Sequence, residues 1–437
     1  EDEVMRTLKA ISVAIAIIFV FVSESIQAFE FEDVTPEEVG FSSEKLSKIQ
    51  ERFDALYEDG RIPNYAIGLY SGNKRFYSRA RGKTSIGEGG EVNLDTIYAF
   101  ASMTKPIAST AIMILIQEDK LSLDSKLSEF YPEYANMFVA PGGSFETTFE
   151  EAKRGITVKD LLTHTSGFTY PPSVTGQGDV AKQYADLRLF FDREPPLNQH
   201  ISTLAQVPLV AHPGETFTYS FSTDVLAGIL EKVTGKRLGE FLDERIFGPL
   251  GMNDSGFYVP PDKLESFAQF YMPMQATASA REALDQKYNA PEAQGKTDDR
   301  IEWKISQGNM FGSQVPTARP NFDSAGGGLY ASLNDYARYC AMILNGGSID
   351  GVRILDDETL KLHLSDLTPQ LTSENFRRDF GDGANFMKFG GGHGIKYLSD
   401  PGPGVGVDYY FWGGAFNTFY WIDPTNGHLG VFATNHS

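Results

Sequence analysis

Strand-like segments stand at both ends of the sequence, and no other feature constrains the fold as strongly. Near the N-terminus, two alternating apolar segments flank a Ser-Gly-Asn turn at residues 71–73, which is typical of a β-hairpin. Three more such segments close the sequence, the last two separated by a turn at residues 423–426. The five predicted strands are residues 65–70, 74–79, 407–412, 415–422 and 427–434. Because strands need partners, this pattern predicts one sheet built from both ends of the chain.

Helical patterns dominate the rest of the sequence. Apolar spacings of three and four predict helices at residues 42–60, 107–116, 157–162, 183–190, 222–234, 238–247 and 333–344. Residues 170–208 are otherwise predicted to form a long loop, and residues 260–320 an elaborated surface segment or lid. We therefore predict an α+β chain. Residues 29–101 and 322–437 would form an α/β domain, and residues 102–321 a mostly helical region with insertions.

A serine and a lysine three residues apart are the first candidates for chemistry. Ser102 and Lys105 follow a strand-like segment at residues 96–100 and open the helix predicted at residues 107–116. A spacing of three places both side chains on one helical face, where a desolvated lysine can take the proton of a serine hydroxyl. Free N–H groups at a helix N-terminus would favour the developing negative charge. The same residues also fit a helix cap followed by a solvated lysine, so this S-x-x-K pattern needs support from elsewhere.

Charge and the N-terminal segment bear on partners and location. The formal net charge is −20 and the pI about 4.8, which argue against nucleic acid or an anionic membrane as a partner. Basic residues after Met5, an apolar run at residues 10–22 and a small residue at Ala28 are typical of a secretory signal. An uncleaved anchor is the less favoured alternative, because the run is short for a bilayer span. We predict a signal peptide at residues 1–28 and a secreted or periplasmic protein without stable membrane insertion.

Other candidate residues are weaker. Cys340 is the only cysteine and falls within a predicted helix, which favours a buried apolar thiol over a nucleophile. His164 has no serine in a G-x-S-x-G motif with which to form a catalytic triad. The seven histidines show no metal-binding spacing, so we expect no metal and no cofactor. The glycine-rich segments at residues 390–394 and 402–406 lack the Lys-Ser/Thr of a phosphate-binding loop, and we expect them to form turns.

Five short motifs follow Ser102 and Lys105 in a fixed order. They are L-L-T-H-T-S-G at residues 161–167, P-G at 213–214 leading to Y-S at 219–220, G-P-L-G-M at 248–252, A-G-G-G-L at 325–329 and W-G-G at 412–414. With the S-x-x-K motif, the set resembles the serine β-lactamase and penicillin-binding-protein superfamily. Within it, the chain is most similar to the class C-like branch that includes the family VIII carboxylesterases. The resemblance extends over about residues 35–437.

The resemblance implies a fold and a set of roles. The fold would be an antiparallel sheet flanked by helices beside a helical region, with the site in the cleft between them. Ser102 would be the acylated nucleophile, and Lys105 would help to deprotonate it. Tyr219 matches the tyrosine of the family's Y-x-N element and would act as, or with, the general base. A phenol and an ammonium that share one proton shift each other's titration, so which of the two takes the serine proton stays open.

The resemblance also assigns an oxyanion hole, and nearby aromatic residues are candidates for a pocket. The backbone N–H groups of Ser102 and Ala415 would stabilise the oxyanion. Ala415 directly follows the W-G-G motif, which consists of Trp412, Gly413 and Gly414. The aromatic residues Tyr170, Phe221 and Trp412 could line an acyl pocket, although they fit a core equally well.

Two departures from the family pattern favour esters over β-lactams. Phe221 stands at the third position of the Y-x-N element, so the amide that contacts an acylamino side chain is absent. The W-G-G motif replaces the K-T-G of lactamases and therefore lacks the cation that pairs with a β-lactam carboxylate. W-G-G is typical of the esterase branch. Relatives usually continue into a C-terminal helix, so the end at Ser437 predicts a truncated chain.

These features together predict a serine hydrolase that cleaves carboxylic esters with short to medium acyl chains through an acyl-enzyme on Ser102. A β-lactamase or D-amino-acid peptidase is the enzymatic alternative, which Phe221 and Trp412 disfavour. The other alternative is a penicillin-binding sensor that deacylates slowly, or a scaffold, which the intact Ser, Lys and Tyr set disfavours. In each case we expect the ligand to be a small ester or a β-lactam-like molecule.

Overall fold

The computed structural model describes residues 29–273, 303–305, 317–401 and 405–436. The predicted signal peptide and much of the predicted lid at residues 260–320 lie outside these residues. From Phe31 onward the described chain forms one compact unit. Among the described residues, no helix has both the length and the apolar composition needed to cross a membrane.

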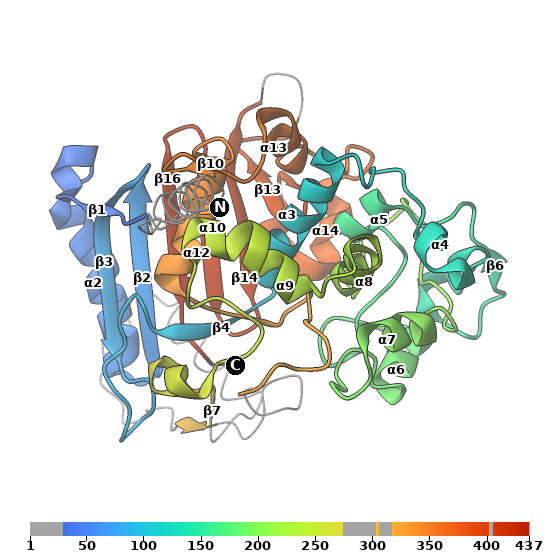
Figure 1. The fold of residues 1–437 in the computed structure, drawn as a ribbon, viewed down its shortest axis with the longest axis horizontal. Helices are drawn as coiled ribbons and strands as arrows, with labels where there is room; N and C mark the ends of the chain where they lie inside the picture. The colour runs from blue at the N-terminus through green and yellow to red at the C-terminus, as the bar shows by residue number, and fades with distance from the viewer. Residues whose placement is uncertain (1–28, 274–302, 306–316, 402–404, 437) are drawn as a thin grey trace, which may run out of the picture. The chain divides into compact units, whose positions relative to one another are not determined.

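An eight-stranded sheet forms the centre of the fold, and both ends of the chain contribute to it (Figure 1). The strand order is β1-β3-β2-β16-β15-β14-β13-β12. Strands β16 and β2 join the two ends, from His428 opposite Ser71 to Ala433 opposite Ala66. The bounds are β1 Glu32–Asp33, β2 Asn64–Ser71, β3 Lys74–Gly82, β12 Met387–Phe389, β13 Gly394–Tyr397, β14 Val407–Gly414, β15 Thr418–Asp423 and β16 His428–Ala433. The predicted α+β fold with a sheet from both chain ends is confirmed.

The sheet differs from the prediction at its two edges. Strand β1 runs parallel to β3, so the sheet is mixed and not wholly antiparallel. Its two residues are too few to show an alternating pattern in the sequence. At the other edge, β12 and β13 flank the glycine-rich segment, with Phe389 opposite Gly394. That segment is a turn, as predicted, but the two short strands beside it were not foreseen.

Helices cover both faces of this sheet. Helix α2 (Ser43–Glu58) contributes Leu46 to an apolar cluster that also contains Trp421 of β15. The ring of the preceding residue, Tyr420, instead contacts Tyr336 of α12 (Leu333–Leu344), with 5.4 Å between ring centres. Because successive residues of a strand point to opposite faces, α2 and α12 cover opposite faces. Cys340 of α12 is fully buried, and burial raises the pKa of its thiol, which confirms the predicted apolar environment.

A second, two-stranded sheet links the N-terminal part of the chain to the glycine turn at residues 324–328. Strand β4 (Ile97–Ala101) pairs antiparallel with β9 (Leu329–Ser332), with a register shift between Ala99 and Ala101. β4 leads directly to Ser102, and β9 follows the glycine turn. The pairing therefore brings two sequence motifs together that lie more than two hundred residues apart.

The helical region stands beside the sheet (Figure 1). Its helix α3 packs against α8, which ends at a left-handed Gly235, and against α13. The helices of this region are α3 Thr104–Gln117, α4 Leu127–Phe130, α5 Val158–Leu162, α6 Gly178–Asp186, α7 Leu197–Leu204, α8 Ser222–Thr234, α9 Leu238–Leu242 and α10 Gly248–Leu250. Later in the sequence, α13 Asp357–His363 and α14 Ser373–Phe380 follow α12. A π-helical turn, η4 Asp243–Phe247, joins α9 to α10, and 3-10 turns are η1 Pro36–Val39, η2 Pro132–Tyr134, η3 Pro141–Gly143, η5 Pro261–Ser266 and η6 Gly381–Ala384. Minor strands are β5 Phe138–Val139, β6 Glu150–Glu151, β7 Tyr271–Pro273, β8 Trp303–Ile305, β10 Ser348–Ile349 and β11 Val352–Arg353.

The prediction of one helix within residues 170–208 is wrong. The structure has two, α6 and α7, and α6 lies earlier than the predicted residues 183–190. Arg188 and Phe190 adopt left-handed backbone angles, which are incompatible with a continuing helix. Pro196, in an extended conformation, is the N-cap residue of α7, which begins at Leu197.

Candidate active site

Ser102 lies in a tight turn between β4 and α3. The preceding residue, Ala101, has a φ of +46°, a left-handed value that costs energy for a residue with a side chain. The N–H of Met103 donates to the carbonyl of Phe100 at 3.1 Å, and the N–H of Lys105 donates to the carbonyl of Ser102 at 3.1 Å. This strand–turn–helix geometry holds the serine at the start of the helix, where the sequence predicted it.

Lys105 is fully buried and reaches the serine. Its Nζ donates to Ser102 Oγ at 3.1 Å and to the Gly326 carbonyl at 2.6 Å. The same Nζ lies 4.6 Å from the centre of the Tyr219 ring and 5.5 Å from that of Tyr170. The Ser–Lys contact predicted from the spacing is therefore present. The alternative of a solvated lysine is wrong.

Tyr219 lies three residues before the start of α8, and its ring is enclosed by other rings. The ring centre is 4.7 Å from that of His164, 5.2 Å from Tyr170 and 5.6 Å from Trp412. Its phenol oxygen is buried and has no hydrogen-bond partner among the described residues. The structure thus gathers Ser102, Lys105 and Tyr219 in one place, with the lysine in contact with both other side chains.

The L-L-T-H-T-S-G motif fixes the segment that carries Tyr219. His164 has a left-handed φ of +54°, and its carbonyl accepts the N–H of Thr218 at 2.8 Å. Its Nδ1 lies 3.3 Å from Ser220 Oγ, next to Tyr219 in sequence. Burial, and then the charge of Lys105, lower the pKa of His164 well below its usual value, so the ring is neutral. His164 therefore has a structural position beside Tyr219, in agreement with the absence of a triad serine for it in the sequence.

The W-G-G motif ends β14 beside the turn that carries Ser102. Gly414 is opposite Thr418 of β15, whose Oγ1 donates to the Phe100 carbonyl at 3.2 Å. A Cβ on Gly414 would lie only 2.3 Å from that same carbonyl oxygen, so a glycine is required there. Trp412 is buried, and the adjoining Ala415 is exposed. Gly414 therefore lies against the backbone two residues before the serine, and the oxyanion role of the other residues stays a prediction.

The two predicted pocket residues differ in their surroundings. Tyr170 is buried, its ring contacts that of Tyr219, and burial raises the pKa of its phenol well above the usual value. Phe221 is also buried. Its ring contacts that of Tyr170 at 4.6 Å, and it packs against the rings of Tyr184, Phe190 and Phe191. A direct role in binding substrate stays a prediction for both residues.

The sequence gives little sign of one further group of residues near Lys105. Asp224 of α8 is buried and accepts hydrogen bonds from Ser324 Oγ at 2.9 Å and from the Gly326 N–H at 3.1 Å. An aspartate in the first turn of a helix is usually a solvated favourable charge, so the sequence offered no reason to single it out. The A-G-G-G-L motif belongs to the set that carries the family resemblance, but the sequence assigns no contact with Lys105 to it.

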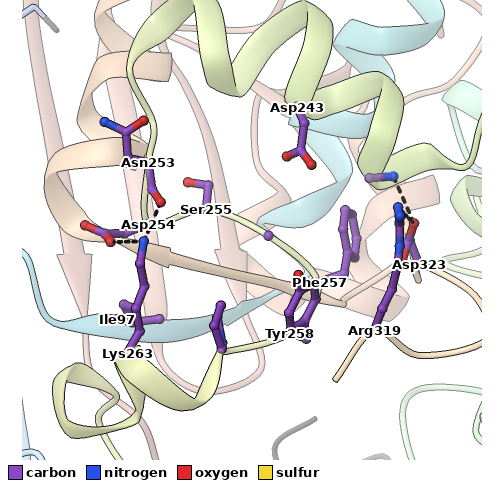
Figure 2. A pocket seen from close by; sticks show the side chains of 13 residues that line it. Ile97, Asp243, Asn253, Asp254, Ser255, Phe257, Tyr258, Lys263, Arg319 and Asp323 are labelled. Atoms are coloured by element: carbon purple, nitrogen blue, oxygen red, sulfur yellow. Dashed lines mark hydrogen bonds and ion pairs between the residues drawn. The ribbon is translucent and has the colours of Figure 1, made fainter. Parts of the chain in front are cut away.

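A polar cavity of about 150 Å³ lies apart from these residues (Figure 2). Its lining includes Asp243, Asp254, Lys263, Arg319 and Asp323, and none of Ser102, Lys105 and Tyr219. Lys263 Nζ contacts Asp254 at 2.7 Å, and Arg319 contacts Asp323 at 3.5 Å (Figure 2). These charges largely satisfy one another. We therefore place the candidate site at Ser102 and not at this cavity.

Comparisons with known proteins show the family to which the chain belongs. The model of the family described as Beta-lactamase matches residues 49–437. Protein Rv1367c of Mycobacterium tuberculosis is 33% identical over 364 residues, which cover 81% of this chain and 81% of that protein. Esterase EstB of Burkholderia gladioli is 27% identical over 403 residues, covering 88% of this chain and 90% of EstB.

A solved structure shows the same fold. EstCE1, described as a hydrolase with promiscuous acyltransferase activity, superposes with a TM-score of 0.68 at 21% identity, covering 90% of this chain and 93% of that one. At this identity the likeness concerns the fold alone. The family model matches nearly all of the described residues. Together with the likeness in fold and the esterase relative, this match shows that the chain belongs to the β-lactamase family and is a serine hydrolase.

Proposed function

We propose that the protein hydrolyses carboxylic esters with short to medium acyl chains through an acyl-enzyme on Ser102. The observation that carries this proposal is the fully buried Lys105, whose Nζ lies 3.1 Å from Ser102 Oγ. At this distance the lysine side chain and the serine hydroxyl can exchange a proton directly, as an activated nucleophile requires. The esterase named among the relatives supports the choice of substrate.

Acylation would begin with attack of Ser102 Oγ on the ester carbonyl carbon. The hydroxyl proton passes to the pair formed by Lys105 and Tyr219, and the C–O bond to the alcohol breaks as the alcohol takes up a proton from that pair. Water then attacks the acyl carbon, gives a proton to the same pair and releases the acid, which restores the Ser102 hydroxyl. The pair serves as base in the first half of each step and as acid in the second.

The developing oxyanion would be stabilised by the backbone N–H groups of Ser102 and Ala415. Neither group donates a hydrogen bond to another described residue. The contact between Gly414 and the Phe100 carbonyl supports this assignment, because it draws the end of β14 toward the turn that carries the serine. Preorganised donors of this kind typically account for a factor of about 10² to 10³ in kcat each.

Trp412, which packs beside Tyr219, favours esters over β-lactams as substrates. Trp412 stands where lactamases carry a cation, and its ring packs against Tyr219. A carboxylate on the substrate gains no charge partner from this residue. We also propose that the protein is exported by way of its predicted signal peptide and that small esters, not nucleic acid, are its ligands, in keeping with the net charge of −20.

A nitrophenyl ester series of increasing acyl length tests the proposal. Wild-type protein should release nitrophenol catalytically, Ser102→Ala should lose this activity, and Ser109→Ala on the same helix should keep it. Ester hydrolysis that survives Ser102→Ala would overturn the assignment. Rapid nitrocefin turnover with poor ester turnover would favour the β-lactamase alternative, and an acyl adduct that persists for hours would favour a sensor.

Acyl transfer to an alcohol is a second candidate function. It is favoured by the exclusion of water from Lys105 and by the acyltransferase activity described for EstCE1. In the presence of a short alcohol, the product should then divide between the free acid and the new ester. Only free acid at every alcohol concentration would exclude transfer.

A further inference from the structure

A buried carboxylate is connected to the candidate lysine through a single glycine. The carbonyl of Gly326 accepts a hydrogen bond from Lys105 Nζ at 2.6 Å, and the N–H of the same residue donates to Asp224 Oδ1 at 3.1 Å. Ser324 Oγ donates to the same carboxylate oxygen at 2.9 Å. Asp224 is 1% exposed, so these groups replace water around it.

The backbone of Gly326 lies close against the carboxylate, with no room for a side chain between them. A Cβ at Gly326 would lie 2.3 Å from Asp224 Oδ2 and 3.3 Å from the phenol oxygen of Tyr170. The backbone therefore approaches the carboxylate as closely as sterics allow. Since Gly326 supplies the carbonyl that holds Nζ, the position of Lys105 beside Ser102 depends on Asp224.

The hydrogen bonds around Asp224 suit an ionised group. Burial raises the pKa of this carboxyl, and the hydrogen bonds from Gly326 and Ser324 together with the charge of Lys105 act in the opposite direction. Both of these hydrogen bonds are donated to the carboxyl, which suits a carboxylate, since a protonated acid also needs an acceptor for its own proton. A negative charge held here favours the ammonium form of a nearby lysine.

The other titratable groups near this pair are four histidines, two tyrosines and one arginine. The groups near the pair are His164, Tyr170, His200 and Tyr219, and those behind α3 are His363 and His393. The arginine is Arg193, whose positive charge lowers the pKa of Asp224. Burial lowers the pKa of the four histidines and raises that of Tyr170, so these side chains are uncharged at neutral pH. Lys105 and Asp224 are thus opposite charges in a largely uncharged environment.

We propose that Asp224 is a positioning residue for Lys105. It fixes the Gly326 carbonyl that holds Nζ beside Ser102, and its charge sets the pH at which the Lys105–Tyr219 pair gives up the proton that must leave before acylation. The inference rests on the proposed function, because it assumes that Ser102 is acylated with the help of this pair.

The test is the pH profile of kcat/KM for a nitrophenyl ester in Asp224→Asn. The amide keeps the shape and can still accept from Gly326, but it carries no charge. We expect the acidic limb of the profile to move to lower pH by about one unit, since the loss of one nearby opposite charge changes a titration by at least this much. The plateau should fall by about tenfold, because the carbonyl that holds Nζ is less firmly fixed.

Asp335→Asn is the matched control. Asp335 is also buried, also stands in the first turn of a helix, and also accepts from a backbone N–H and a serine hydroxyl, those of Asp254 and Ser255. It has no connection to Lys105. Its substitution should leave the acidic limb in place, whatever it does to the melting temperature. An equal shift in both variants, or none in Asp224→Asn, would refute the inference.

A milder variant keeps the test decisive if Asp224→Asn does not fold. Ser324→Ala removes one donor but keeps the charge of Asp224, which that hydrogen bond no longer partly neutralises, so the acidic limb should move to higher pH by less than half a unit. An unmoved limb in a folded Ser324→Ala protein would then overturn the inference. Failure of the proposed function is seen separately, as wild-type protein that is not acylated on Ser102.

Discussion

Gly414→Ala should impair catalysis without unfolding the protein. The added Cβ would lie 2.3 Å from the Phe100 carbonyl oxygen and 2.2 Å from Thr418 Oγ1. Carbon–oxygen contacts without a hydrogen bond need about 3.3 Å, so the end of β14 must retreat by about 1 Å from the turn that carries Ser102. A misplacement of this size costs about 10²-fold in rate, or about 2.7 kcal/mol of transition-state stabilisation.

The neighbouring glycine provides the comparison. A Cβ on Gly413 would meet its nearest atoms at 3.4 and 3.5 Å, which is ordinary contact. Gly413→Ala should therefore lose at least tenfold less kcat/KM than Gly414→Ala when both are measured with the same nitrophenyl ester. Thermal melts establish that both variants are folded. Equal losses in the two variants, or a fully active and folded Gly414→Ala protein, would refute the reasoning about the approach of β14 to the serine turn.

Three further predictions concern single side chains. Tyr219→Phe should lower kcat/KM by about 10² to 10⁴-fold. The melting temperature should stay nearly unchanged, because the phenol oxygen has no hydrogen-bond partner among the described residues to lose, and a large drop in melting temperature would contradict this. Cys340 should not react with a thiol reagent until the protein is unfolded, since it is fully buried and burial raises the pKa of its thiol. Burial raises the pKa of Asp335 from 3.8 to about 6, so its contribution to stability is present below pH 4 and is lost as the pH rises through 6. Denaturant titrations should show this as a decline of about 3 kcal/mol in the free energy of unfolding between pH 4 and 7, and Asp335→Asn should remove that part of the pH dependence.

The sequence was most informative where a pattern is local. The spacing of Ser102 and Lys105 predicted their contact, because the three-residue spacing of a helix is independent of the rest of the fold. The alternation in the terminal segments predicted one sheet from both ends, which the pairing of β16 with β2 confirms. The short strands β1, β12 and β13 could not be predicted, because they are only two to four residues long and show no alternation of apolar and polar residues.

Other parts of the site depend on contacts that no local pattern encodes. Gly326 stands 221 residues after Lys105 and 102 after Asp224, and only the folded chain brings the three together. The Asp224 carboxylate could not be told from an ordinary first-turn charge, because burial is a property of the packing around it. The sequence could not decide whether Phe221 lines a pocket or belongs to the core, because its neighbours Tyr184, Phe190 and Phe191 come together only in the folded chain.

Acylation of Ser102 is the central claim, and an acid-quenched reaction tests it most directly. Protein mixed with an excess of a nitrophenyl ester, quenched within seconds and digested, should show the added mass of the acyl group on the peptide that contains Ser102. The adduct should be absent from Ser102→Ala and should disappear from the wild-type protein once the ester is consumed. An acyl group found on another residue, or catalytic ester hydrolysis with no adduct on Ser102 and unchanged activity in Ser102→Ala, would contradict the account.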